Sequence, residues 1–163
     1  MAVILGVIAL AALAAMLLAP PTRPRMIAIP AGVWLVGALD RSVSTGAAVA
    51  GQEITLVTTE PLRLDEKLSL PAGILIGGEI ARVSAGGRAA GAPALTLRFT
   101  RMEVGGRAYP IDAESLTIGG GNDSPGTLTG GQLVLPPGQQ LRIRLAQPVA
   151  VEYAGTPRSG RRN

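Results

Sequence analysis

The sequence contains no cysteine and no histidine, and aromatic residues make up only 2% of its 163 residues. Without cysteine, the chain has no disulfide, no thiolate metal ligand and no cysteine nucleophile. This absence leaves the compartment open, because exported bacterial proteins often lack disulfides. Without histidine, the Ser-His and Cys-His arrangements of hydrolases are excluded, and zinc has no imidazole ligand.

The remaining candidates for catalysis lack the spacing that the chemistry needs. Lys67 is the only lysine, and it lies with Ser69 in a polar, turn-like stretch. Asp65 and Glu66 are adjacent, and neighbours on a strand point to opposite faces, which argues against a paired acid and base. We therefore expect a non-enzymatic protein with no catalytic residue, no metal site and no cofactor. A hydrolase is kept only as a third alternative.

The net charge of +4 comes from the flanks of the chain. Residues 26–153 contain nine arginines and one lysine against all eleven acidic residues, whereas Arg23, Arg25 and three C-terminal arginines lie outside that range. A face that binds nucleic acid needs clustered cations interleaved with aromatic residues. We therefore expect no nucleic-acid partner.

What the sequence does contain is aliphatic residues and turn formers. Hydrophobic residues make up 47%, and there are 22 glycines and 13 prolines. Because aromatic residues are scarce, the core must consist of Val, Ile, Leu and Ala, which suit pleated sheets, while Gly and Pro supply turns. The length allows one domain with a hydrophobic core rather than two.

Residues 2–19 form an unbroken run of apolar and small residues that two prolines close. This length is near the lower limit for a membrane-spanning helix and the upper limit for the core of a signal peptide. We expect residues 1–19 to be a hydrophobic helix that serves as a transmembrane anchor or signal segment, followed by a Pro/Arg linker over 20–26. Residues 154–163 carry three arginines and little apolar surface, so they predict a disordered basic tail.

One tetrapeptide pattern, apolar-Pro-small-Gly, occurs three times ahead of a strand-like run. Its turn residues are Pro30, Gly32, Pro71, Gly73, Pro136 and Gly138. Proline fixes φ at the second turn position and glycine accepts the positive φ that follows, so each tetrapeptide predicts a type II turn. The spacings are unequal, which indicates a recurring turn before a strand and not a solenoid repeat.

Apolar and polar residues alternate between these turns, as in half-buried strands. For example, Leu95, Leu97 and Phe99 face one way. Strand-like runs cover residues 33–39, 53–59, 74–83, 94–104, 107–118 and 140–151. No helical periodicity follows Pro30. We expect an all-β fold over residues 27–153, a small barrel or sandwich of about seven or eight strands, preceded by one N-terminal hydrophobic helix.

The turns and strands follow one another in a specific order. In chain order they are Ile29-Pro30-Ala31-Gly32, Leu39-Asp40 with Ser42 and Ser44, Ala50-Gly51-Gln52, Glu60-Pro61, Leu70-Pro71-Ala72-Gly73, Gly77-Gly78-Glu79, Arg98 to Met102, Gly105-Gly106-Arg107, Pro110-Ile111-Asp112 and Leu135 to Val151. This set resembles the periplasmic β-barrel domain of the conjugal-transfer scaffold proteins of type IV secretion systems. It resembles still more the small exported bacterial proteins of unassigned function that carry this domain alone. The resemblance covers residues 27–151.

The resemblance implies a β-domain that contacts other proteins near a membrane. In the secretion family, the domain packs side by side in rings and ties the inner membrane to an outer-membrane channel. An insertion before the last turn carries amphipathic helices across the outer membrane there, and a long proline-rich linker spans the periplasm. In this sequence, only residues 119–131 occupy the place of that insertion, and only residues 19–25 occupy the place of the linker. We therefore do not expect a pore or an envelope-spanning role.

Three arginines lie on the polar faces of the predicted strands, namely Arg98, Arg142 and Arg144. If their strands pair, these residues form one cationic surface stripe that can meet anionic lipid or an acidic partner. The alternative is that each arginine is a solvated outward position, balanced by Glu79 and Glu103.

The function that we expect is that of a scaffold or assembly factor in the bacterial envelope. Its partners are other proteins, in a membrane complex or a homo-oligomer, and the membrane is contacted through residues 2–19. The resemblance favours a β-domain in the periplasm at the inner membrane, whereas arginines that follow the apolar run favour the cytoplasmic side. The alternative function is a single-helix accessory subunit of a larger membrane complex, whose β-domain caps one face.

Overall fold

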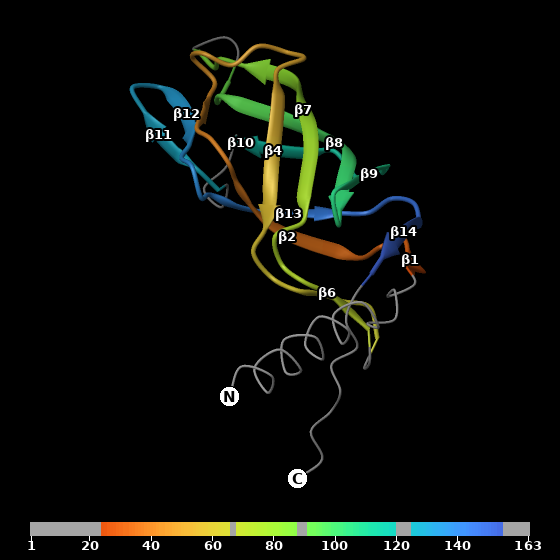
Figure 1. Cartoon of the computed structure of the whole chain (residues 1–163). Coiled ribbons are helices and arrows are strands. Elements are labelled where there is room, and N and C mark those ends of the chain that lie inside the picture. The colour runs from red at the N-terminus through yellow and green to blue at the C-terminus, as the bar shows by residue number, and fades with distance from the viewer. Residues whose placement is uncertain (1–23, 66–67, 88–90, 120–124, 155–163) are drawn as a thin grey trace, which may run out of the picture. The chain divides into compact units, whose positions relative to one another are not determined.

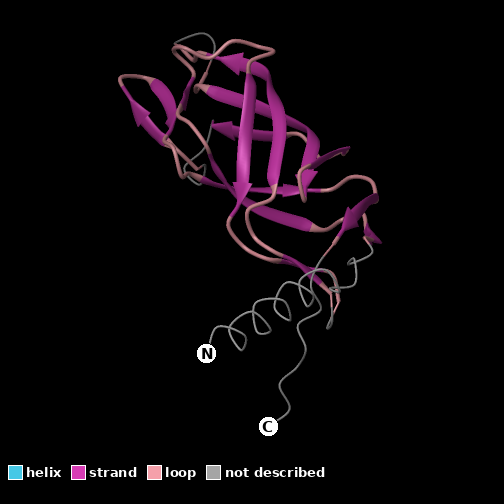
Figure 2. Cartoon of the chain, in the orientation of Figure 1, coloured by secondary structure: helices cyan, strands magenta, loops and turns pink. Residues whose placement is uncertain are grey.

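A computed structural model describes residues 24–65, 68–87, 91–119 and 125–154 (Figure 1). These ranges contain fourteen strands and no helix, so the predicted all-β fold is confirmed (Figure 2). Residues Met26–Tyr153 form one compact unit.

Several predictions concern residues that the structure does not describe. The expected hydrophobic helix over 1–19 lies outside the described ranges, as do all but the last three residues of the linker 20–26 and all but the first residue of the tail 154–163. The described ranges contain no candidate for a membrane-spanning helix.

Seven strands form the main sheet, and every pairing within it is antiparallel. They are β2 (Trp34–Leu39), β4 (Glu53–Thr58), β7 (Leu75–Ser84), β8 (Ala94–Val104), β9 (Arg107–Pro110), β10 (Leu116–Gly119) and β13 (Gln140–Arg144). Six of them follow the order β10-β8-β7-β4-β2-β13, and β9 pairs with the second half of β8. Figure 1 shows β4 beside β7, with β2 and β13 running across their lower ends.

The other seven strands pair outside the main sheet. β1 (Arg25–Ile29) pairs with β14 (Val149–Tyr153), β12 (Gln132–Leu135) lies between β11 (Thr127–Thr129) and β3 (Val43–Ser44), and β5 (Leu62–Arg63) pairs with β6 (Ser69–Leu70). The strands outnumber the predicted seven or eight because two of the predicted runs divide and six strands lie outside the predicted runs, namely β1, β3, β5, β6, β11 and β12. The run 107–118 becomes β9 and β10, and the run 140–151 becomes β13 and β14.

The main sheet curls into a half-barrel, and backbone hydrogen bonds connect the two ends of its strand order. β-bulges interrupt the pairing of β7 with β8 at two points, and bulges increase the local bend and twist of a sheet. The N–H of Glu114 donates to the carbonyl of Arg144 at 2.9 Å, and the N–H of Ala146 donates to the carbonyl of Asp112 at 2.8 Å. The chain between β9 and β10 is thereby joined to the end of β13.

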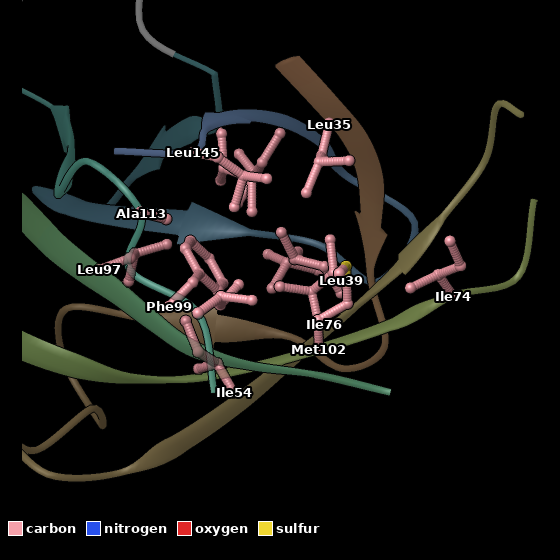
Figure 3. Close-up of a cluster of buried hydrophobic side chains, with 14 of the residues drawn as sticks. Leu35, Leu39, Ile54, Ile74, Ile76, Leu97, Phe99, Met102, Ala113 and Leu145 are labelled. Carbon is pink, nitrogen blue, oxygen red and sulfur yellow. The ribbon is translucent and has the colours of Figure 1, made fainter. Parts of the chain in front are cut away.

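The core lies on the concave side of this sheet and is almost entirely aliphatic. The predicted alternation is observed, because Leu95, Leu97 and Phe99 of β8 are fully buried. Phe99 and Met102 are the largest departures from Val, Ile and Leu, and they pack among side chains such as Ile54 and Ile76 from β4 and β7 (Figure 3). The core therefore has the composition that the scarcity of aromatic residues predicts.

Candidate interaction surface

The three predicted turns precede β2, β7 and β13, and their glycines have the positive φ that an L side chain rarely adopts. The φ angles are 83° at Gly32, 93° at Gly73 and 80° at Gly138. In the third turn, the N–H of Gln139 donates to the carbonyl of Pro136 at 3.1 Å. Pro136 is therefore the first residue of this turn, whereas the sequence predicts it as the second.

Each of these glycines also connects its turn to another strand. The N–H of Gly32 donates to the carbonyl of Leu145 at 2.7 Å, and the N–H of Gly138 donates to that of Leu39 at 2.8 Å. The N–H of Gly73 donates to the carbonyl of Thr58, also at 2.8 Å. The turns led by Pro30, Pro71 and Pro136 are thus structural, because they hold the starts of three main-sheet strands.

The structure does not bring the three candidate arginines together through paired strands. Arg98 lies on β8, whereas Arg142 and Arg144 lie on β13, and β8 and β13 do not pair with each other. Arg98 forms an ion pair with Glu79 of β7, as the alternative of balanced outward positions predicts. Because this pairing is absent, Arg98 lies at one site and Arg142 with Arg144 at another.

The second site is a cluster in which two arginines lie over the only tryptophan. Trp34, Arg142 and Arg144 make up this Trp-Arg cluster, with Cζ of Arg142 at 5.2 Å and Cζ of Arg144 at 5.9 Å from the centroid of the indole. Trp34 is 50% exposed. Arg144 Nη1 also lies 3.3 Å from Oε1 of Glu114. A small hollow of about 40 Å³ lies beside Trp34, and Pro61 and Glu60 are among the residues that line it.

An apolar strip crosses the outer face of the main sheet next to this cluster. Val36 and Ala38 alternate outward on β2, and the register places Ala38 opposite Val57 of β4, and Val57 opposite Leu75 of β7. These four residues are only partly buried or exposed, and Leu75 is 39% exposed. Because the inner face of the same strands already holds the core, the sheet is apolar on both faces here.

The sequence contains one signal for this strip. Residues 33–39 are apolar or glycine throughout, whereas a strand with one solvated face alternates apolar with polar residues. The strip itself was not predicted, because Ala38, Val57 and Leu75 come together only through the pairing of β2, β4 and β7.

A polar groove of about 160 Å³ lies beside the strip on the same outer face. Its lining residues are Glu53, Ile54, Thr55, Gly77, Gly78, Glu79, Thr100 and Arg101. The register places Glu53 directly opposite Glu79, and like charges in this arrangement repel each other. Arg98 offsets the charge of Glu79 only. In the described residues no third acidic side chain joins them to form a group that could hold a metal ion.

No protein-family model matches this sequence, and no curated protein matches it either.

Proposed function

We propose that this protein is a non-enzymatic, protein-binding β-domain that acts as a scaffold or assembly factor in the bacterial envelope, held at the membrane by residues 2–19. The observation that carries the proposal is the apolar strip of Val36, Ala38, Val57 and Leu75 on the outer face of the sheet. Contiguous apolar surface that is exposed on a folded domain marks sites of protein or membrane contact. The resemblance to the periplasmic domain of the secretion scaffolds supports the same role.

The composition of the surroundings also suits a protein interface. Such interfaces have an apolar centre and a polar rim. The strip is bordered by Arg142 and Trp34 at one end and by Glu103, opposite Leu75, at the other. A partner with an apolar ridge and charged flanks is therefore the expected ligand.

The experiment that tests the proposal places a charge in the centre of the strip. Val57→Glu is expected to abolish co-purification of partner proteins from the native host, because an unpaired carboxylate would be buried in the contact. Thr127→Glu, at an exposed position of β11, serves as the control and should retain the partners. Both variants should keep the β-sheet signal in circular dichroism. If Val57→Glu retains the same partners as the native protein, this surface is not the interface.

A second candidate function is the accessory subunit of a membrane complex with its β-domain in the cytoplasm. The arginines at positions 23 and 25, directly after the apolar run, favour it through the positive-inside rule. Intact mass and protease accessibility of the C-terminal tail distinguish the two candidates. A retained Met1 with a tail on the cytoplasmic side supports the accessory subunit, and a shortened or anchored chain with a periplasmic tail supports the envelope scaffold.

A further inference from the structure

The Trp-Arg cluster (Trp34, Arg142 and Arg144) presents two cations on one exposed aromatic ring. β13 and β2 pair so that Arg144 lies opposite Trp34, and the outward Arg142 lies two residues before Arg144. Glu114 offsets the charge of Arg144, but Arg142 has no carboxylate partner in the described part of the chain. The cluster therefore combines a half-exposed indole with a guanidinium that no acidic side chain neutralises.

The contacts within the cluster leave the donors of Arg142 available. Its only partner in the described part of the chain is the face of the Trp34 ring, and stacking on a ring does not use the N–H groups of a guanidinium. Those groups match phosphate oxygens in a bidentate geometry. Arg142 is thus held in position by the indole while its hydrogen-bonding capacity faces outward.

Indole together with arginine is the composition that proteins present to an anionic membrane surface. Tryptophan favours the interface because its ring is apolar and its N–H is polar, and arginine is attracted to anionic headgroups. The hollow beside Trp34 is only about 40 Å³, so the cluster lies on an open surface and not in a ligand cavity. A flat lipid surface requires no such cavity.

The chain itself limits how far this cluster can be from the membrane. Only six residues, 20–25, separate the end of the apolar run from the second residue of β1, and such a linker extends at most about 20 Å. One turn after β1 leads directly to Trp34. Figure 1 shows the start of β2 near β1 and β14, so the cluster lies at the same end of the domain as β1.

We propose that Trp34, Arg142 and Arg144 contact the anionic headgroups of the membrane to which the chain is tethered. The contact fixes the orientation of the β-domain at the membrane. This inference rests on the proposed function for its tether, residues 2–19, and adds a second point of attachment.

Trp34 is the only tryptophan, so its fluorescence reports on this contact without labelling. The full chain is reconstituted into vesicles of phosphatidylcholine alone or of phosphatidylcholine with phosphatidylglycerol, each with and without brominated lipid. We expect a blue-shifted emission and quenching by brominated lipid in the phosphatidylglycerol vesicles, with both effects reduced at high salt. Replacement of either arginine should lower the ratio of lipid-quenched to unquenched Trp34 about fivefold in the phosphatidylglycerol vesicles.

The variants Arg142→Gln and Arg144→Gln are compared with Arg98→Gln, which removes the same charge from β8. Arg98→Gln should leave the quenching unchanged, because Arg98 lies on another strand and pairs with Glu79. All three positions face outward, and thermal unfolding followed by circular dichroism checks that each variant is folded. Equal loss of quenching in all three variants would overturn the proposal, since it would indicate a general charge effect.

Flotation of the vesicles separates this inference from the proposed tether. If the chain floats with both kinds of vesicle but Trp34 stays unquenched, the tether stands and the cluster contact is wrong. If the chain floats only with phosphatidylglycerol vesicles and the arginine variants do not float, the tether is wrong and the cluster contact stands. If Trp34 emission responds to polyglutamate and not to vesicles, the site binds an acidic protein and the lipid proposal is overturned.

Discussion

At the scale of single residues, two buried threonines satisfy backbone groups that the aliphatic core cannot. Thr45 and Thr58 are the buried polar residues of the described chain. Oγ1 of Thr58 accepts a hydrogen bond from the N–H of Ile74 at 2.9 Å, and Oγ1 of Thr45 accepts one from the N–H of Leu133 at 3.0 Å. A buried N–H without an acceptor is costly, so each hydroxyl stabilises the fold by accepting this hydrogen bond. The alternation of apolar and polar residues along a strand does not predict this role.

Replacement of Thr58 by valine should therefore destabilise the fold although the volume hardly changes. Thr58→Val leaves the N–H of Ile74 without its acceptor and should lower the free energy of unfolding by about 1–3 kcal/mol. Thr58→Ser keeps the hydroxyl and is the matched control, with a smaller loss from the missing methyl group. Chemical denaturation of both variants measures the difference, and equal losses would show that the hydrogen bond contributes nothing.

Gly138 provides a second prediction at this scale. Its φ of 80° costs an L residue roughly 1–2 kcal/mol, while the space around its Cα is open, so no steric contact confuses the measurement. Gly138→Ala should lower the free energy of unfolding by that amount, and Gly138→Asn by less, because Asn tolerates the left-handed region. Thermal unfolding of the two variants checks the order, which would be reversed if only side-chain size mattered.

At the scale of the elements, β7 and β8 pass close to each other where β7 carries two consecutive glycines. A Cβ on Gly78 would lie 2.3 Å from the carbonyl oxygen of Arg98 and 2.9 Å from Cα of Phe99. A Cβ on Gly77 would meet only the end of the Arg101 side chain, at 3.2 Å. The backbone of β8 cannot move aside as the flexible guanidinium of Arg101 can. A side chain is therefore excluded sterically at Gly78 but not at Gly77.

The two alanine variants should consequently behave differently. Gly78→Ala forces β7 away from β8 and should cost about 1–3 kcal/mol or more of unfolding free energy. Gly77→Ala is the matched control and should change it by less than about 0.5 kcal/mol. Denaturant titrations of the two proteins make the comparison. A tolerated Gly78→Ala would mean that the bulge in β8 relaxes to accept the methyl group.

At the scale of the whole molecule, the first and last strands, β1 and β14, pair with each other and contribute to the core. Val151 of β14 and Ile29 of β1 are fully buried in the common core. The N–H of Glu152 donates to the hydroxyl of Tyr109 at 2.9 Å, and its carboxylate forms an ion pair with Arg107, so β14 is also attached to β9. The two ends of the compact unit are thus held by each other and by the main sheet.

A fragment that spans residues 24–154 should therefore fold without the remainder of the chain. We expect it to unfold cooperatively, with the β-sheet circular dichroism of the full protein. A fragment that ends at residue 147 loses β14 and exposes the partners of Val151, and it should be unfolded or lose most of its cooperativity. Two fragments with the same melting behaviour would show that β14 is dispensable.

The sequence by itself determined the fold class, the inward face of most strands and the positions of the turns. These properties are local: a side-chain period of two assigns Leu95, Leu97 and Phe99 to one face, and the glycine at the end of each Pro-containing turn accepts a positive φ. Only the tertiary structure decided which strands are neighbours. Trp34 lies opposite Arg144, which is far from it in sequence. Arg98 occupies the same kind of outward strand position as Arg144, but its strand β8 does not pair with β13. The strip and the Trp-Arg cluster depend on strand register, and register arises from non-local hydrogen bonds and core packing that no single strand encodes.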